Sequence, residues 1–163
     1  NELSRQAGLA LDRRTNGLVV YENMETSVPG IFASGNVVHV HDLVDFVTAE
    51  SQRAGYAAAL YAQGGEAGGD AVEVKNGASV TYTVPQKLRP GNIDKYVELF
   101  FRVNFVYTDM EIQVSSGGKV LSRFQREHMA PGEMEKIILP KALFSQVLNN
   151  EITVSVVKGG EEK

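Results

Sequence analysis

The residues best suited to chemistry gather between Gly35 and Val47. This stretch reads GNVVHVHDLVDFV and brings a glycine and an amide together with two histidines and two aspartates. Glycine lets a backbone approach a ligand closely, and an amide side chain both donates and accepts hydrogen bonds. A short apolar segment precedes the stretch and a helix is expected to follow it. One interpretation is therefore a ligand held where a strand runs into a helix.

The histidine pair admits three interpretations. His39 and His41 alternate, so in an extended segment both side chains would point the same way and could ligate a metal together with Asp42. The only other histidine is His128, far along the chain. We favour the lining of a ligand cavity over a metal centre or a plain polar loop. We therefore predict no metal site.

The elements that must position these residues change in character near residue 64. The apolar pattern predicts a short helix, two short strands and a long helix, at residues 2–7, 18–21, 31–34 and 45–63. Asp45 is the expected N-cap of the long helix. The next segment, GGEAGGD over 64–70, is typical of a flexible linker.

From residue 71 onward the apolar residues recur with a period of two. Strands are expected at about 79–84, 95–107, 110–114, 119–127, 134–139 and 152–156, with a short helix after Pro140. Short strands separated by frequent turns are typical of an antiparallel immunoglobulin-like β-sandwich. The predicted fold class is therefore α+β in two parts, with residues 1–63 before the linker and the sandwich over 71–163.

The first part of the chain resembles a known family. TSVPGIFASGNV (26–37) and VTAESQRAGYAAA (47–59) resemble the C-terminal FAD-binding segment of the pyridine nucleotide-disulfide oxidoreductases, in particular the thioredoxin-reductase-like branch. The positions that match the family pattern are Thr26, Ile31, Phe32, Ala33 and Gly35. The resemblance covers about residues 1–63 and does not extend to 70–163.

The resemblance implies that residues 1–63 are the incomplete C-terminal piece of an α/β FAD-binding domain. The family's acidic residue, which bonds the ribityl chain of FAD, falls at Asn36, where the hydrogen bond survives without the charge. Asp45 stands where the branch has a glutamine, and we expect it to cap the helix. The predicted cofactor-binding residues are Gly35, Asn36, Val37, Asp45, Phe46 and Val47.

The functional expectation follows from that resemblance. The chain is expected to be the C-terminal part of a FAD-dependent, NAD(P)H-linked oxidoreductase, inactive alone, because the family's glycine-rich pyrophosphate motif and its NAD-binding domain do not occur in it. It would contribute the ribityl and pyrimidine side of the FAD site. The alternative is a non-catalytic module for protein–protein interaction or oligomerisation.

Composition narrows the possible partners. The formal net charge of −4 and the lack of a basic stripe argue against nucleic acid as a partner, and no apolar run is long enough to span a membrane. The chain has no cysteine, which is compatible with the cytoplasmic location that we expect. Expected partners are the rest of the parent flavoprotein and a subunit docked on the sandwich. Self-association is also expected.

Overall fold

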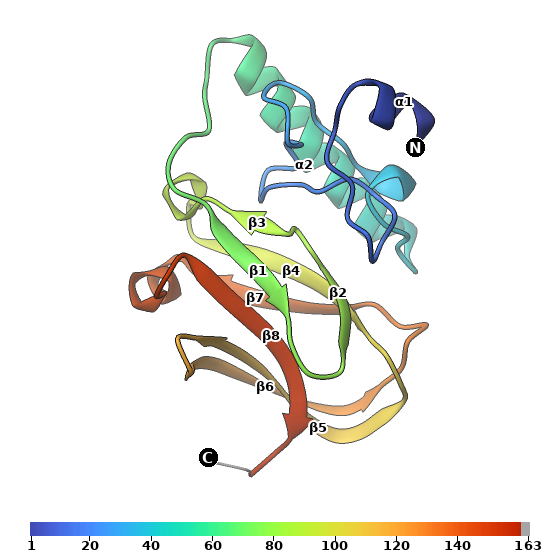
Figure 1. The fold of residues 1–163 in the computed structure, drawn as a ribbon, viewed down its shortest axis with the longest axis vertical. Helices are drawn as coiled ribbons and strands as arrows, with labels where there is room; N and C mark the ends of the chain where they lie inside the picture. The colour runs from blue at the N-terminus through green and yellow to red at the C-terminus, as the bar shows by residue number, and fades with distance from the viewer. Residues whose placement is uncertain (161–163) are drawn as a thin grey trace.

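The computed structural model describes residues 1–160 as a mixed α+β structure in which strands predominate (Figure 1). The N-terminal segment and the long helix lie together at one end of the molecule, next to two β-sheets. The helical elements are α1 (Glu2–Gln6), η1 (Gly35–Val37), α2 (Val44–Ala62), η2 (Pro90–Asn92) and η3 (Lys141–Gln146). Neither α-helix of the described residues combines the length and apolar character that crossing a bilayer requires.

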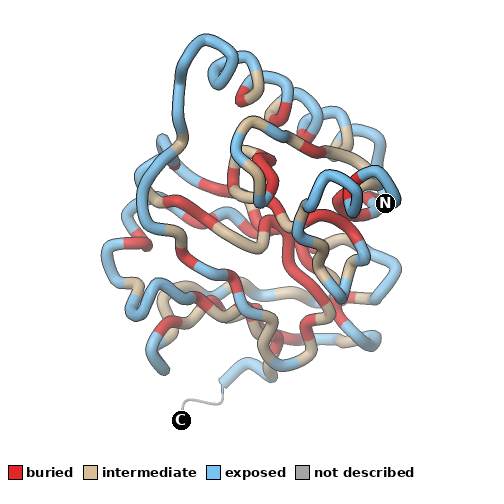
Figure 2. Tube along the Cα trace, turned by 45° about the horizontal axis from the view of Figure 1, so that its top comes forward, coloured by how far each residue is buried: buried red, intermediate tan, exposed pale blue. Residues whose placement is uncertain are grey.

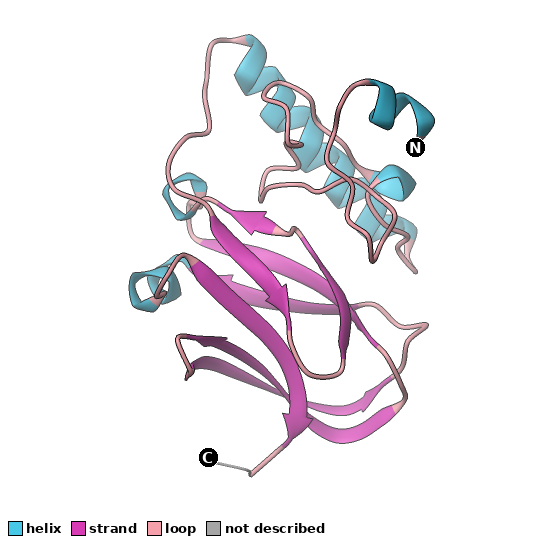
Figure 3. Cartoon of the chain, viewed as in Figure 1, coloured by secondary structure: helices cyan, strands magenta, loops and turns pink. Residues whose placement is uncertain are grey.

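Eight strands form the two sheets within residues 1–160. Their bounds are β1 (Val72–Asn76), β2 (Val80–Val84), β3 (Lys87–Leu88), β4 (Tyr96–Val103), β5 (Tyr107–Ser116), β6 (Lys119–Met129), β7 (Glu135–Pro140) and β8 (Glu151–Lys158). One sheet has the order β3-β1-β8-β5-β6 and the other has the order β2-β4-β7. Figure 3 shows that these strands occupy the second part of the chain.

One apolar core joins the sheets, because strands of both contribute alternate residues to it. Ile112 and Val154 come from the five-stranded sheet, whereas Leu99, Phe101 and Ile137 come from the three-stranded sheet, and all five are nearly inaccessible. Figure 2 shows the buried trace concentrated in these strands. The predicted period of two therefore reflects real burial on one face of each strand.

Two details of the strand prediction are wrong. The sheets are not purely antiparallel, because β1 pairs with β8 in parallel, for example Val74 opposite Ile152. The long strand expected over 95–107 ends at Val103, where the chain turns and crosses to the other sheet. Phe105 lies in this turn and is exposed, although its alternation with Val103 placed it in the core.

The N-terminal segment lacks the strands that its apolar runs predict. Over 1–43 the regular pairings are two isolated bridges, Leu11 with Leu18 and Glu25 with Phe32. The long helix was predicted to within one residue at each end, but Leu43 is its N-cap and no side chain caps it. Asp45 lies instead in the first turn of α2, so its predicted capping role is wrong.

The N-terminal segment and α2 cover the outer face of the β2-β4-β7 sheet. A second apolar cluster joins N-terminal residues such as Val20, Met24 and Val38 to Ala54 of α2 and to Tyr82 and Val84 of β2. Val80 of the same strand belongs to the first core instead, because the register of β2 against β4 shifts between Val80 and Tyr82 and turns the later residues to the other face. The glycine-rich segment 64–70 thus connects two parts that are packed together.

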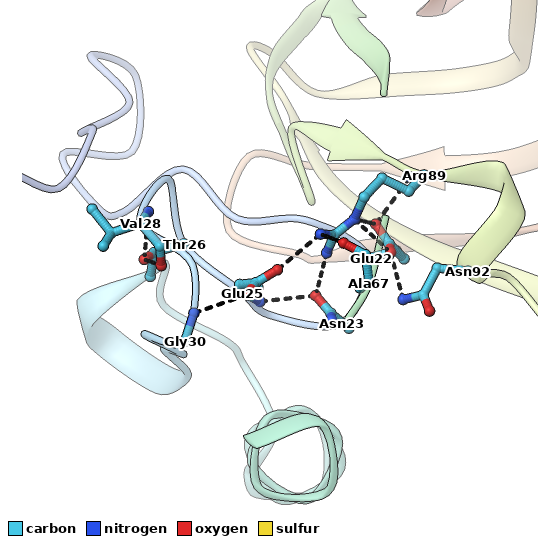
Figure 4. Close-up of polar contacts among 9 residues, drawn as sticks. All are labelled: Glu22, Asn23, Glu25, Thr26, Val28, Gly30, Ala67, Arg89 and Asn92. Carbon is cyan, nitrogen blue, oxygen red and sulfur yellow. Dashed lines mark hydrogen bonds and ion pairs between the residues drawn. The ribbon is translucent and has the colours of Figure 1, made fainter. Parts of the chain in front are cut away.

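Arg89 ties the N-terminal segment to the sheets through a buried polar network (Figure 4). Its guanidinium lies 3.1 Å from Glu22 Oε1 and 2.8 Å from Glu25 Oε2, and it donates to Asn23 Oδ1 at 2.8 Å. All three side chains of the ion-pair network are at most 7% exposed. The guanidinium also stacks on the ring of Tyr21, with its carbon 4.1 Å from the ring centre.

Replacing Arg89 by methionine is expected to lower the free energy of unfolding by about 3–5 kcal/mol, because two buried carboxylates would lose their cation. Arg123→Met is the matched control. Its guanidinium is half-exposed beside Glu111, and loss of such a pair costs at most about 1 kcal/mol. Urea denaturation of both variants measures the difference. Equal destabilisation would contradict the assigned importance of Arg89.

Candidate functional site

The loop after Phe32 carries the predicted glycine and amide. It enters η1 at Gly35, whose φ of 71° lies in the left-handed region that favours glycine. A β-carbon there would lie 3.8 Å from Val47, so the loop packs directly against the first turns of α2. Ser34 and Ser51 join the same two elements through a hydroxyl–hydroxyl bond of 3.1 Å.

A buried carboxylate, Glu50, fastens this loop to α2. Its Oε1 accepts a hydrogen bond from the Gly35 N–H at 2.8 Å. Its Oε2 lies 3.0 Å from His39 Nε2 and 2.7 Å from His41 Nε2. The three side chains are at most 3% exposed. Residues 35–41 are thereby held at three points by one side chain.

The hydrogen positions on the two imidazoles follow from burial. Neither Nδ1 atom of His39 and His41 has a hydrogen-bond partner within the described part of the chain. A hydrogen on either Nδ1 would be a buried donor without an acceptor, which is costly. We infer that each ring carries its hydrogen on Nε2 and donates it to Glu50. The carboxylate then receives three N–H donors.

The pKa of Glu50 reflects this arrangement. Burial alone would raise the pKa, but the hydrogen bonds from His39, His41 and Gly35 lower it from 4.5 to about 2. The carboxylate is therefore ionised at neutral pH. The site is a compact acceptor of backbone and imidazole hydrogen bonds.

The same three side chains have the composition of a metal site. Their nearest ligand atoms all lie within 4.8 Å of one another. However, both Nε2 atoms converge on Glu50 Oε2 itself, so a cation could bind only if that oxygen moved away. The Nδ1 atoms of His39 and His41 would also lack the hydrogen-bond acceptors that usually orient metal-bound histidines. The hydrogen-bonded arrangement explains the observed distances directly, and the absence of a metal site stays a prediction.

Asp42 does not join the histidines. It lies 2.5 Å from the Arg102 guanidinium and accepts a hydrogen bond from the backbone N–H of Met134. Burial opposes ionisation, but these bonds lower the pKa of Asp42 overall. Arg102 also donates to the Val40 carbonyl and to the hydroxyl of Tyr82. This network holds residues 40–42 against β2 and β4.

The predicted cofactor-binding residues lie in two adjacent places. Gly35, Asn36 and Val37 form η1, and Asp45, Phe46 and Val47 form the first turns of α2. Asn36 and Asp45 are exposed, whereas Phe46 packs against His41 and Phe100 with ring centres 5.9 and 5.5 Å apart. The structure thus brings η1 and the start of α2 together.

Sequence reasoning missed the central residue of this region. A charged residue of a helix is normally expected at its surface, so the sequence alone places Glu50 in solvent, but the buried face of α2 runs through Glu50, Ala54 and Ala57. The stripe predicted from the apolar and small residues of the helix, Val47, Ser51, Ala54, Ala58 and Tyr61, shares Ala54 with this face but is centred about 50° away from it around the helix axis. The spacing of Glu50 to the two small buried residues, at i+4 and i+7, is the signal that could have identified it.

No family model, curated protein or solved structure matches the chain. The fold and the local geometry are therefore the observations from which function is inferred. They define an exposed loop at η1 and the exposed start of α2, which the buried carboxylate of Glu50 holds together. The resemblance of residues 1–63 adds an expectation about the ligand.

Glu50→Gln is expected to lower the free energy of unfolding by about 1–3 kcal/mol. An amide nitrogen would face either the Gly35 N–H or the two imidazole N–H groups, so donors would oppose donors. Glu127→Gln, at an exposed position of β6, is the control and should leave stability unchanged. Urea denaturation at neutral pH measures both. Wild-type stability of Glu50→Gln would contradict the proposed hydrogen bonding.

The contribution of Glu50 should also depend on pH. Because its pKa is lowered on folding, its stabilisation is complete above pH 4.5 and is lost as the pH falls towards about 2. The stability difference between the wild type and Glu50→Gln should therefore shrink across this window. Denaturation curves from neutral pH down to about pH 2.5 test this. A difference that stays constant would show that the carboxylate is not specifically stabilised.

Proposed function

We propose that this chain is the C-terminal part of a cytoplasmic FAD-dependent, NAD(P)H-linked oxidoreductase related to the pyridine nucleotide-disulfide oxidoreductases. In this proposal residues 1–63 complete the FAD-binding domain. Residues 71–163 form an immunoglobulin-like sandwich for contacts with a partner subunit. The chain alone is inactive, because the groups that would hold the rest of FAD and bind NAD(P)H belong to the remainder of the parent.

One observation carries this proposal: an exposed amide and an uncapped helix start lie side by side. Gly35 packs against Val47, so the exposed side chain of Asn36 is next to the first turn of α2. The first N–H groups of an α-helix have no intrahelical partner, and no side chain caps those of α2. Such an end favours negative charge and carbonyl oxygens.

Each group of this region has a distinct part in the proposal. Asn36 would bond the ribityl hydroxyls, and the start of α2 would stabilise negative charge on the pyrimidine side of the ring. FAD, when bound, supplies hydride acceptance from the nicotinamide. The N–H of Gly35 is engaged by Glu50 and therefore positions the loop. Asp45 is exposed in the first turn and would oppose an anionic ring beside it.

A second candidate function is that of an interaction module. Large apolar residues are exposed near the start and along the side of α2, namely Val40, Leu43, Val44, Tyr56 and Leu60. A face of α2 rich in small residues is also open, since no atom lies within 4 Å of a β-carbon added at Gly55. Exposed apolar surface of this kind favours association with another protein surface.

Asn36→Leu is expected to reduce FAD retention in the full-length parent polypeptide, because the ribityl contact is lost. Asn36→Asp restores the acidic residue of the family pattern and should retain FAD at least as well as the wild type. The visible flavin absorption of the purified proteins measures retention, and their unfolding curves should coincide because Asn36 is exposed. A colourless parent that ignores added FAD would overturn the proposal.

The exposed residues of α2 generate a separate expectation for the 163-residue chain. It should form dimers or larger assemblies, and the double change Leu43→Ser with Val44→Ser should shift it towards the monomer. Sedimentation at several concentrations measures the distribution. The matched control is Phe105→Ser, which removes an exposed apolar residue from the β4–β5 turn. A wild-type chain that stays monomeric at all concentrations would contradict this candidate.

A further inference from the structure

A second concave site lies beside the C-terminal half of α2, away from Gly35. It is a cleft of about 500 Å³ between α2, the loop 22–25 and the start of β4, with segment 65–67 closing one side. Clefts of about 300–1,000 Å³ are the usual size for small-molecule sites. Its residues take no part in the proposed FAD contacts.

The floor of the cleft is apolar. Ala57, Ile93 and Val97 line it and are all less than 10% exposed. Phe32 also contributes to the lining. A ligand with an apolar body would therefore displace water from surface that interacts poorly with it.

Tyrosines form much of the wall. Tyr56 of α2 is 69% exposed and Tyr96 at the start of β4 is 56% exposed, so each ring offers free surface. Tyr61 is more firmly placed, because it lies edge-on to Phe32 at 6.2 Å between ring centres. Aromatic faces carry partial negative charge and attract cations.

The charges of the lining are predominantly negative. It contains five carboxylates and one guanidinium, namely Glu22, Glu25, Glu66, Asp94, Glu98 and Arg53. Arg89 pairs with the first two carboxylates, and Glu98 pairs with Arg53 at 3.2 Å and with Lys136 at 3.5 Å, so three cations stand against the five carboxylates. Within residues 1–160, the remaining carboxylates, Glu66 and Asp94, form no ion pair. The cleft thus has two uncompensated negative charges and no free positive charge.

We propose that this cleft binds a small organic cation, an ammonium group attached to an apolar body about the size of a phenyl ring. The body would cover the floor at Ile93 and Val97. The ammonium would lie near the tyrosine faces and the two free carboxylates. A neutral molecule of the same shape gains only the apolar contact, so charge determines selectivity.

The test is a titration of the isotope-labelled 163-residue chain, followed by amide chemical shifts, with phenethylammonium chloride and with 2-phenylethanol. Saturable shifts at Glu66, Asp94 and Val97 are expected for the cation, with affinity roughly tenfold or more above that for the alcohol. High salt should weaken the cation only. No flavin is involved, so failure here and failure of the FAD proposal are distinguishable.

Two variants sharpen the result. Glu66→Gln combined with Asp94→Asn should lower the affinity for the cation about tenfold, towards that for the alcohol, and both positions are exposed, so the fold is retained. Tyr56→Leu should weaken the cation more than the alcohol. Glu127→Gln is the control, because it removes an exposed carboxylate that lies on β6 and does not line the cleft. Equal binding of cation and alcohol, no saturable shift, or an unaffected double variant would each overturn the proposal.

Discussion

The buried contact between Arg89 and the two carboxylates Glu22 and Glu25 is the interaction on which the arrangement of this chain depends. The N-terminal segment has no sheet of its own, so its loops can be fixed only by what they lie against. Apolar packing on the outer face of β2-β4-β7 holds the segment against the sheet but does not fix its orientation. The Arg89 guanidinium fixes the orientation of residues 22–25 relative to the sheet, because its N–H donors point in set directions. Glu25 extends the effect, because its other oxygen accepts the N–H of Gly30 in the next turn.

Glu50 has a similar role at the other end of the N-terminal segment, where it holds residues 35–41 against α2. A short loop carries backbone groups and imidazoles that must be satisfied where no strand is available to pair with them. One carboxylate on the neighbouring helix accepts three of these donors and so replaces the missing ladder. In both centres one buried charged side chain joins elements that no strand pairing connects: Arg89 contacts residues 22–25, and Glu50 of α2 contacts residues 35–41. Loss of Arg89 would leave two buried carboxylates without their cation, whereas loss of a donor at Glu50 would leave a buried carboxylate with fewer hydrogen bonds.

The sequence predicts the local elements well and the packing between them poorly. The period of two identified most of the strands, and helix α2 was placed to within one residue, because both patterns depend on neighbours along the chain. The strand β1 was not predicted, and its parallel pairing with β8 was therefore missed as well, since pairing depends on the path of the chain and not on neighbours in sequence. Alternation with Leu99 and Phe101 of the core places Phe100 on the other face of β4, yet Phe100 is buried against Phe46 and His41, because the N-terminal segment and α2 cover that face. The same covering explains why the burial of Glu50 was not foreseen.

The two candidate sites lie near opposite ends of α2. They favour ligands of opposite charge, as do the two ends of a helix dipole. The start of α2 presents N–H groups beside Asn36, which suits an acceptor-rich ligand. The other end contributes Leu60 and Tyr61 to the cleft, near the end of the helix that favours positive charge. The backbone N–H groups of residues 63–65 already bond the last carbonyls, so the free carboxylates at 66 and 94 must supply most of the attraction. A helix that is held rigidly by Glu50 at one end can therefore serve two ligands of opposite charge without conflict.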